Sequence, residues 1–408
     1  MKERKVKVEK YENVFKEALA LEPELIKIRR QLHQNPETGF ELEVTKNYVY
    51  KELASMGYTP SWCGQAGVVA TIGNGQGSTF LLRADMDALP ITEETGLEFA
   101  SKNDKMHACG HDFHTTMLLG TAKLLKKYQA KLNGTIKLMF QPAEEIMEGA
   151  ADMIKSGVLE NPKVDGGMMI HVLPGAPIPD GTVLIAKAGK GLSSCDWFEI
   201  KIKGKSGHGS TPKNAIDPIA PAAAIYQGLM EIQAREISAD ALVALTIGEF
   251  HSGSTSNVIP DTAVLRGTLR TYDDQLRSEM KIRMQELVEG LAKAYRCEGE
   301  MTFLAGAPTL ENAEEVVVHA NNYLLHYLAA DKVLSVSDLP INEVQMGSED
   351  FAYVSHEIPV VMLALAAADS RNSEPYPVHH PKLVLNEEAL KYGVTAYTAM
   401  ALSWLEKE

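Results

Sequence analysis

Between residues 67 and 174, short apolar runs alternate with stretches of helical periodicity. The runs are as short as strands, and they carry few charges except where they end. They are GVVATIG (67–73), TFLLRADMD (79–87), TIKLMFQ (135–141) and GGMMIHVLP (166–174), with helices predicted over 114–129 and 149–157. Strands buried on both faces have near-continuous apolar sequences. The pattern therefore predicts an α/β fold in which helices sandwich a mostly parallel sheet.

Two helices are predicted before the first of these strands. Residues 13–36 carry apolar side chains at helical spacing up to Pro36, and a second helix follows and closes at Gly57. The strand and helix alternation resumes late in the chain with VVMLALAAA (360–368).

The pattern changes near residue 190. WFEIKIKGK (197–205) alternates apolar and polar residues as a half-exposed strand does, and 274–296 forms a long amphipathic helix pattern. A chain of 408 residues is also too long for one ordinary core. We therefore expect a discontinuous main domain, 1–189 and 306–408, with a smaller α+β domain inserted at 190–305.

Composition excludes several classes of function. The net charge of −14 argues against binding the nucleic-acid backbone, which needs clustered lysine and arginine. The four cysteines show no CxxC spacing, so a disulfide framework is not expected. No signal peptide and no apolar run of transmembrane length is visible, which predicts a cytoplasmic protein without a membrane partner.

Acids and histidines gather where the predicted strands of the main domain end. In an open α/β sheet, ligands bind at that edge. Thiolate, imidazole and carboxylate groups are the usual ligands of zinc and similar ions, so the pattern predicts a metal site. The residues at the strand ends, or in the loops that follow them, are Asp85, Asp87, Cys109, His111, His114, Glu144, Glu145, His171, His379 and His380.

Each candidate also has a simpler interpretation. Cys109 alone would usually be a small buried apolar residue, or it could be a redox thiol, but its position two residues from His111 favours a ligand. A helix N-terminus beside it would favour the thiolate. The Glu144–Glu145 pair would usually be a solvated face. After Pro142 we expect extended backbone there, which would point one carboxylate at the metal and leave the other to handle a proton.

Taken in order, nine motifs resemble the amidohydrolase branch of the aminoacylase/carboxypeptidase metallopeptidases, which includes hippurate hydrolases, indole-3-acetyl-amino acid hydrolases and N-acetyl-diaminopimelate deacetylases. RRQLHQNPETGFEL (29–42) is similar to the family's N-terminal helix, so the resemblance spans nearly the whole chain. The motifs are LRADMDALPI (82–91), HACGHDFHTTMLLGTA (107–122), FQPAEE (140–145), IHVLP (170–174), GHGSTP (207–212), SNVIPD (256–261), GTLRTYD (267–273), GSEDFA (347–352) and VHHP (378–381).

The resemblance implies a zinc-exopeptidase-like catalytic domain with two divalent metal ions, Zn²⁺ being favoured by a thiolate ligand and Mn²⁺ the alternative. Glu144 corresponds to the general base and Asp87 to the acid that orients a ligand. His107 and His114 are expected to be exposed or to support the ligands. The implied metal ligands are Cys109, His111, Glu145, His171 and His379, with the cysteine motif serving the bridging position.

The inserted domain is expected to act as a lid and a dimerisation domain, which implies a homodimer or a higher homo-oligomer. In it, His208 corresponds to a histidine that stabilises the oxyanion, and Asn257 and Arg270 match substrate-side positions. For Arg270 a surface ion pair is an equal alternative. Glu349 matches a glutamate beside the metal pocket.

Two motifs depart from the family pattern. Lys213 replaces the final histidine of the GHGS-x-PH motif, and His380 fills a place that usually holds a small polar residue. His379 is therefore taken as the ligand by register.

The expected activity is metal-dependent hydrolysis of the amide bond in small N-acyl or N-aroyl amino acids. Cleavage of dipeptides or short peptides, as by a dipeptidase or carboxypeptidase, is the alternative within this class. A non-catalytic metal- or ligand-binding relative is the alternative outside it. The presence of Glu144 and of every implied ligand argues against that second alternative.

Overall fold

The computed structural model describes residues 13–175, 178–339, 346–369 and 375–406. The chain forms two compact units. The first unit comprises 1–191, 311–342 and 353–408, and the second comprises 192–310 and 343–352. Residues 346–352, which include Glu349, therefore belong to the second unit. β7 (Gly189–Leu192) and β14 (Leu310–Asn312) lie where the chain passes between the units.

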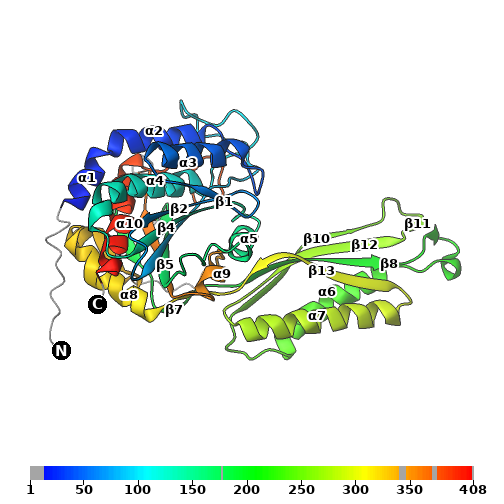
Figure 1. Cartoon of the computed structure of the whole chain (residues 1–408). Coiled ribbons are helices and arrows are strands. Elements are labelled where there is room, and N and C mark those ends of the chain that lie inside the picture. Colours follow the sequence, from blue (N-terminus) through cyan, green and yellow to red (C-terminus); the bar gives the residue numbers. More distant parts are fainter. Residues whose placement is uncertain (1–12, 176–177, 340–345, 370–374, 407–408) are drawn as a thin grey trace. The chain divides into compact units, whose positions relative to one another are not determined.

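The first unit is built on an eight-stranded sheet in the order β1-β2-β4-β3-β5-β16-β6-β15. Figure 1 shows strands β1, β2, β4 and β5 of this sheet with helices around them. Four successive strands, β4, β3, β5 and β16, are parallel, and their interior is almost wholly buried. This confirms the predicted α/β fold with a mostly parallel sheet. The strands are β1 (Ser61–Cys63), β2 (Gly67–Gly73), β3 (Thr79–Asp85), β4 (Thr135–Gln141), β5 (Gly166–Leu173), β6 (Val183–Ile185), β15 (Val333–Ser335) and β16 (Val360–Ala366).

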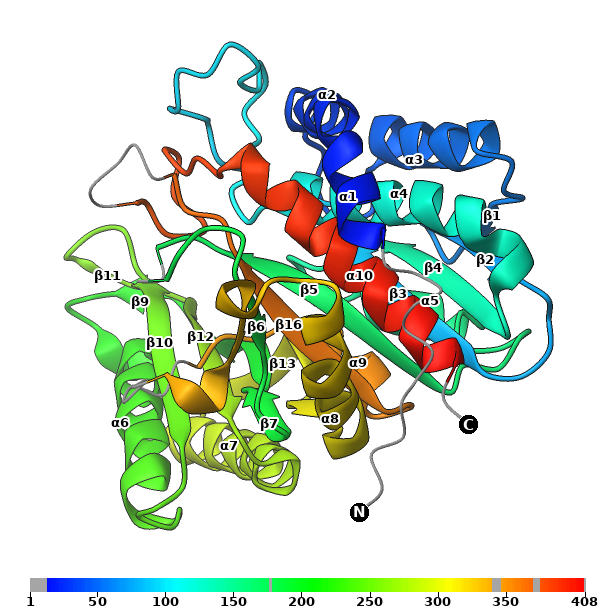
Figure 2. The same cartoon turned by 90° about the vertical axis from the view of Figure 1, so that its left-hand side faces the viewer.

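The helices of the first unit differ from the prediction in several places, and α8, α9 and α10 were not among the predicted helices. The predicted helix over 13–36 is two helices, because Pro23 stands at the start of the second one and cannot occupy a helix interior without losing a hydrogen bond. The last helix, α10, has no polar face and lies buried along the sheet (Figure 2). The helices are α1 (Val14–Ala20), α2 (Glu22–His33), α3 (Glu43–Ser55), α4 (His111–Tyr128), α5 (Gly149–Lys155), α8 (Glu314–Tyr323), α9 (Ala352–Ser355) and α10 (Leu390–Leu405).

The strand order reverses at β3. From β3 the chain passes through α4 to β4 on one side, and from β4 it passes through α5 to β5 on the other side of β3. Because such crossovers are right-handed, opposite directions place α4 and α5 on opposite faces of the sheet. A crevice is expected between β3 and β5 at their carboxyl ends, which is where ligands bind in folds of this kind.

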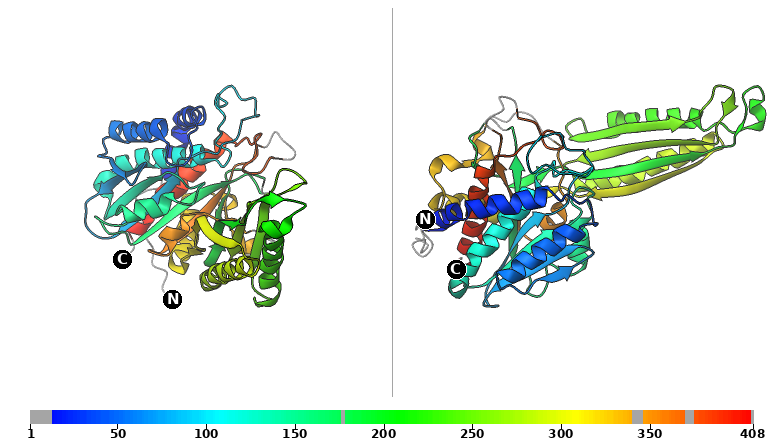
Figure 3. Two further views of the ribbon diagram at one scale, coloured as in Figure 1. Left: turned by 90° about the vertical axis from the view of Figure 1, so that its right-hand side faces the viewer. Right: turned by 90° about the horizontal axis from the view of Figure 1, so that it is seen from above.

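The second unit is an antiparallel sheet, β10-β12-β8-β13, with two helices on one face, as the views of Figure 3 show. Alternate residues of β8, such as Phe198 and Ile200, join the core with Met284 and Val288 of the long helix. Its elements are β8 (Cys195–Lys203), β9 (Gly207–His208), α6 (Ile219–Arg235), β10 (Val243–Ser252), β11 (Val258–Ile259), β12 (Thr262–Thr271), α7 (Asp274–Ala294) and β13 (Glu298–Ala307). No helix in the described part of the chain is long and apolar enough to cross a bilayer.

Candidate metal centre

The candidate ligands meet at the carboxyl ends of β3 and β5. Asp85 ends β3, His171 stands near the end of β5, and α4 begins at His111 beside them. Gly110 lies between Cys109 and His111 in the left-handed region (φ +88°) and caps α4. Only glycine adopts this conformation readily. The turn at Gly110 allows the side chains on either side of it, Cys109 and His111, to face the same crevice.

Five side chains form two ligand groups that share Cys109. One group is Cys109, His111 and His171, and the other is Cys109, Glu145 and His379; within each group the donor atoms lie within 4.8 Å of one another. The Cys109 Sγ lies 3.5 Å from His171 Nε2, and His379 Nε2 lies 3.5 Å from a Glu145 carboxylate oxygen. This arrangement suits two cations joined by one thiolate.

The two outer histidines are oriented by their surroundings. The Nδ1 of His171 donates to the Val172 carbonyl at 2.7 Å, which leaves Nε2 directed at Cys109. His379 adopts a left-handed φ of +65°, and its backbone N–H donates to the Ala108 carbonyl at 2.7 Å. His380 accepts from a backbone N–H through Nδ1 and stacks on Tyr376, so it is occupied away from Glu145.

The unpartnered atoms of the centre fit a metal. Three buried atoms of the centre make no hydrogen bond of ordinary geometry with any described residue. They are the two ring nitrogens of His111 and the Oε1 of Glu145. Burial, reinforced by the charge of Glu145, raises the pKa of the Cys109 thiol well above its usual value. Burial raises the pKa of Glu145 to about 7 and lowers that of His171 to about 3. Bound cations would stabilise the charged thiolate of Cys109 and the carboxylate of Glu145, and so offset the free-energy cost of burying these charges. Sulfur, nitrogen and oxygen donors suit zinc-type ions.

Asp87 links the candidate general base to a ligand. Its two carboxylate oxygens accept the backbone N–H groups of Glu144 and Glu145 at 3.1 and 3.2 Å, and one of them lies 3.4 Å from His111 Nδ1. The buried carboxylate of Glu144 comes within 3.8 Å of His111 Nε2. Asp87 therefore anchors the loop that carries the two glutamates, and its role in orienting a ligand stays a prediction.

The backbone of that loop is not extended as predicted. Residues 144–147 form a turn, and Ala143 and Met147 take left-handed φ values of +55° and +58°. A carboxylate oxygen of each glutamate nevertheless lies 3.8 Å from His111 Nε2, and Asp87 anchors both backbone amides. The prediction of extended backbone rested on Pro142 alone. It missed the turn because the carboxylate that anchors the loop, that of Asp87, is far away in the sequence.

The comparisons with known proteins identify the family. Residues 81–403 match the model of peptidase family M20/M25/M40. The chain belongs to this family. It is 37% identical over 393 residues to an N-acetylcysteine deacetylase of Bacillus subtilis, covering 95% of this chain and 98% of that protein. It is 36% identical to thermostable carboxypeptidase 2 of Saccharolobus solfataricus (98% and 99% covered) and 34% identical to the hippurate hydrolase of Campylobacter jejuni (97% and 100% covered).

A solved structure supports the metal interpretation. A Bacillus subtilis dinuclear metal-binding peptidase of the M20 family matches with a TM-score of 0.76 and 34% identity, covering 96% of this chain and 100% of that one. The family and the named relatives confirm that the chain is an amide-bond hydrolase of the amidohydrolase branch.

The remaining predicted M20 residues lie in the second unit, and their roles stay predictions. His208 is exposed on β9, where its Nδ1 contacts Ser210 Oγ at 2.8 Å. The backbone carbonyl of exposed Asn257 accepts from the Gly209 N–H at 2.8 Å. The Arg270 guanidinium donates to the Met346 carbonyl at 2.7 Å and to the Ser348 hydroxyl at 2.9 Å. Glu349 is buried, and its carboxylate accepts from the Phe351 N–H at 3.1 Å.

The two other histidines of the HACGHDFH motif are both buried. Of the two alternatives raised for them, exposure is therefore excluded. Burial lowers the pKa of His107 to about 3. The Nδ1 of His114 contacts the Asp85 carboxylate at 2.6 Å. His114 follows His111 by three positions on α4, which places both on one face of the helix, and that spacing was the available sequence signal.

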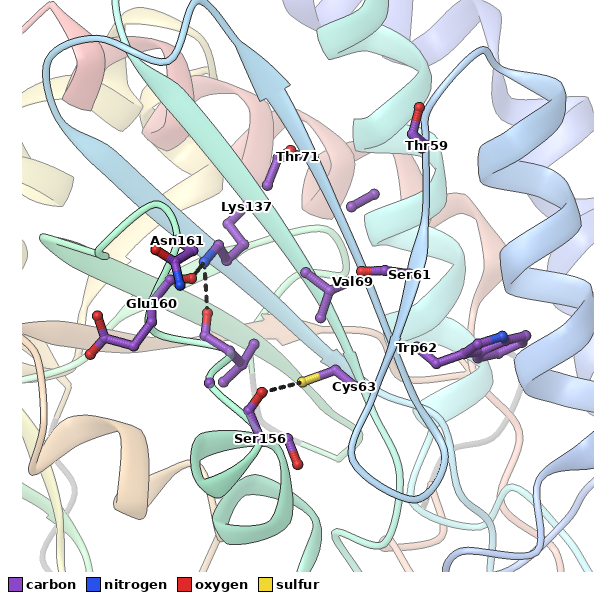
Figure 4. Close-up of a pocket in the computed structure, with 13 residues that line it drawn as sticks. Thr59, Ser61, Trp62, Cys63, Val69, Thr71, Lys137, Ser156, Glu160 and Asn161 are labelled. Carbon is purple, nitrogen blue, oxygen red and sulfur yellow. Dashed lines mark hydrogen bonds between the residues drawn. The ribbon is translucent and has the colours of Figure 1, made fainter.

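A pocket of about 260 Å³ elsewhere in the first unit contains none of the candidate ligands (Figure 4). Lys137 reaches across it from β4, and its ammonium donates to the carbonyls of Val158, Glu160 and Pro162 at 2.6–2.9 Å. These three bonds match the three donors of the ammonium, so Lys137 fastens the loop after α5.

Proposed function

We propose that the chain hydrolyses the amide bond of N-acyl or N-aroyl amino acids at a centre of two divalent metal ions. The observation that supports this most directly is the sharing of Cys109 by two ligand groups, with the carboxylate of Glu144 beside them. The proposed ligands are Cys109, His111, Glu145, His171 and His379.

The metals would supply the electrophile: when bound, two divalent cations polarise the scissile carbonyl and lower the pKa of a water from about 15.7 towards about 7. A soft thiolate ligand favours zinc, and manganese is the alternative. Because Cys109 belongs to both groups, its thiolate would be available to hold either ion.

The protein's own part of the reaction is the movement of one proton. Glu144 takes the proton from the attacking water, holds it in a buried site, and gives it to the departing amine nitrogen. Asp87 keeps the Glu144 backbone in place during both transfers through the 3.1 Å hydrogen bond. His208 remains the predicted group for the oxyanion, since preorganised charge contributes most where charge develops.

The proposal is tested by removing the metal and the base separately. Dialysis against EDTA is expected to abolish hydrolysis of N-acyl amino acids, and added Zn²⁺ or Mn²⁺ is expected to restore it. Glu144→Gln is expected to bind metal as the wild type does but to lose turnover by about 10²–10⁴-fold. Glu148→Gln, an exposed glutamate of the same loop, is the matched control. Full activity after EDTA treatment, or an active Glu144→Gln variant, would refute the mechanism.

The second candidate is cleavage of short peptides. It is favoured by one observation, the 36% identity to a carboxypeptidase. Ratios of kcat/KM on acetyl-amino acids, hippurate and dipeptides separate the two activities. A preference for dipeptides would place the chain among the peptidases.

The predicted homo-oligomer stays a prediction. A sedimentation experiment that finds only monomer would contradict it.

A further inference from the structure

The hydrogen-bond ladder between β3 and β5 stops before the two strands end. The last register pair is Arg83 with Met169, although β3 continues to Asp85 and β5 to Leu173. These final residues are the ones that approach the candidate ligands. Something other than the backbone must therefore hold the two strands at this end.

A tyrosine from α10 takes the first missing position. The Tyr397 hydroxyl donates to the Arg83 carbonyl at 2.6 Å and accepts from the Ile170 N–H at 2.9 Å. Two hydrogen bonds in series thus replace the single bond that a continuous ladder would form. The side chain is fully buried.

A histidine from α4 takes the second position. His114 Nε2 accepts from the Val172 N–H at 2.9 Å, and Nδ1 contacts the Asp85 carboxylate at 2.6 Å. Because an amide N–H can only donate, Nε2 must be the acceptor, so the proton is on Nδ1 and is donated to Asp85. The neighbouring Thr115 hydroxyl donates to the Asp85 carbonyl at 2.6 Å.

We propose that Tyr397 and His114 are positioning residues that hold β3 and β5 apart and thereby place His171 within the metal centre. The two amides that they hold, those of Ile170 and Val172, flank His171 in the sequence. His114 also reaches the other side of the centre, because its partner Asp85 lies 3.7 Å from His111 Nε2. The inference rests on the proposed metal-dependent function.

Distances decide whether this spacing matters. If Tyr397 and His114 did not stand between β3 and β5, the two strands could pair directly. A single N–H···O bond of about 2.9 Å would then replace two bonds in series. His171 would then move by on the order of 2 Å, well beyond the roughly 0.5 Å within which a metal site must be held. The same hydrogen bonds could serve stability alone, so a test must separate metal binding from stability.

The test compares Tyr397→Phe, His114→Leu and His114→Gln with the wild type. A glutamine amide separates its donor and acceptor about as far as an imidazole does, so it is the conservative replacement. Tyr58→Phe is the matched control, because it also removes a buried tyrosine hydroxyl, bonded to the Ala122 carbonyl at 2.7 Å. Zn²⁺ and Co²⁺ affinity and stoichiometry are measured by competition with a chromophoric chelator, and the Co²⁺ visible spectrum reports ligand geometry.

Tyr397→Phe and His114→Leu are expected to weaken the binding of at least one metal by about 10–100-fold and to change the Co²⁺ spectrum. His114→Gln is expected to recover most of the affinity, and Tyr58→Phe is expected to match the wild type. If His114→Leu does not fold, Tyr397→Phe and His114→Gln still decide the matter. Wild-type affinity in Tyr397→Phe, or an equal loss in Tyr58→Phe, would overturn the inference. A wild-type chain that binds no divalent metal would instead overturn the proposed function.

Discussion

Gly110 is a residue at which one added methyl group should disturb the centre. A Cβ on Gly110 would lie 2.4 Å from the Val172 Cγ2 and 3.1 Å from the Leu385 Cδ1, in a backbone conformation with φ of +88°. The left-handed conformation costs a residue with a Cβ about 1–2 kcal/mol, and overpacking adds about 1–3 kcal/mol. Gly110→Ala should therefore lower the free energy of unfolding by about 2–5 kcal/mol.

The two contributions can be separated with a control and a double-mutant cycle. Gly157 has a similar φ of +83° but no atom within 4 Å of its added Cβ, so Gly157→Ala should cost only the conformational part. Adding Val172→Ala to Gly110→Ala should recover part of the packing cost, as a coupling of about 1–3 kcal/mol.

Urea unfolding followed by circular dichroism in EDTA measures these differences without a contribution from bound metal. A second measurement, the metal affinity of the folded Gly110→Ala variant, should fall, because Val172 follows His171. If Gly110→Ala proves no more costly than Gly157→Ala, the clash with Val172 does not control this turn.

Three further predictions concern other parts of the first unit. Lys137→Met should lower the free energy of unfolding by at least about 2 kcal/mol in urea titrations, because three carbonyls lose their donor. Asp87→Asn should reduce kcat by about 10–100-fold while a chelator assay still finds metal bound, since the NH₂ group that replaces one carboxylate oxygen is a donor and cannot accept a backbone N–H. Burial lowers the pKa of His33, but its contacts with Asp112 and Glu93 outweigh burial and raise it overall. The protonated His33 ring therefore contributes fully to the free energy of unfolding below about pH 6.5, and this contribution is lost as pH rises through the folded pKa. In urea unfolding, His33→Gln should lower the free energy of unfolding less at pH 9 than at pH 6.

Short apolar runs in the sequence predicted most of the first unit's strands well. β2 and β4 have the predicted bounds, and β3 and β5 end within two residues of them, because strands buried on both faces must be apolar throughout. The long helix α10 was not among the predictions. It is apolar on all sides, so it has no periodic pattern to detect. The break between α1 and α2 was missed because the periodicity continues through Pro23.

For the candidate site, the sequence by itself determined which kinds of ligand are available and at which edge of the sheet they stand. Strand ends and helix starts are local features, and the side chains they carry can be counted along the chain. Only the tertiary structure decided which of those residues come together in each ligand group and which support them. It made Cys109 common to two groups, directed Asp87 at the backbone of Glu144 and Glu145, and placed Tyr397, from the other end of the chain, between β3 and β5. Each of these contacts joins residues far apart in sequence, and hydrogen bonds between distant residues leave no periodic pattern from which they could be predicted.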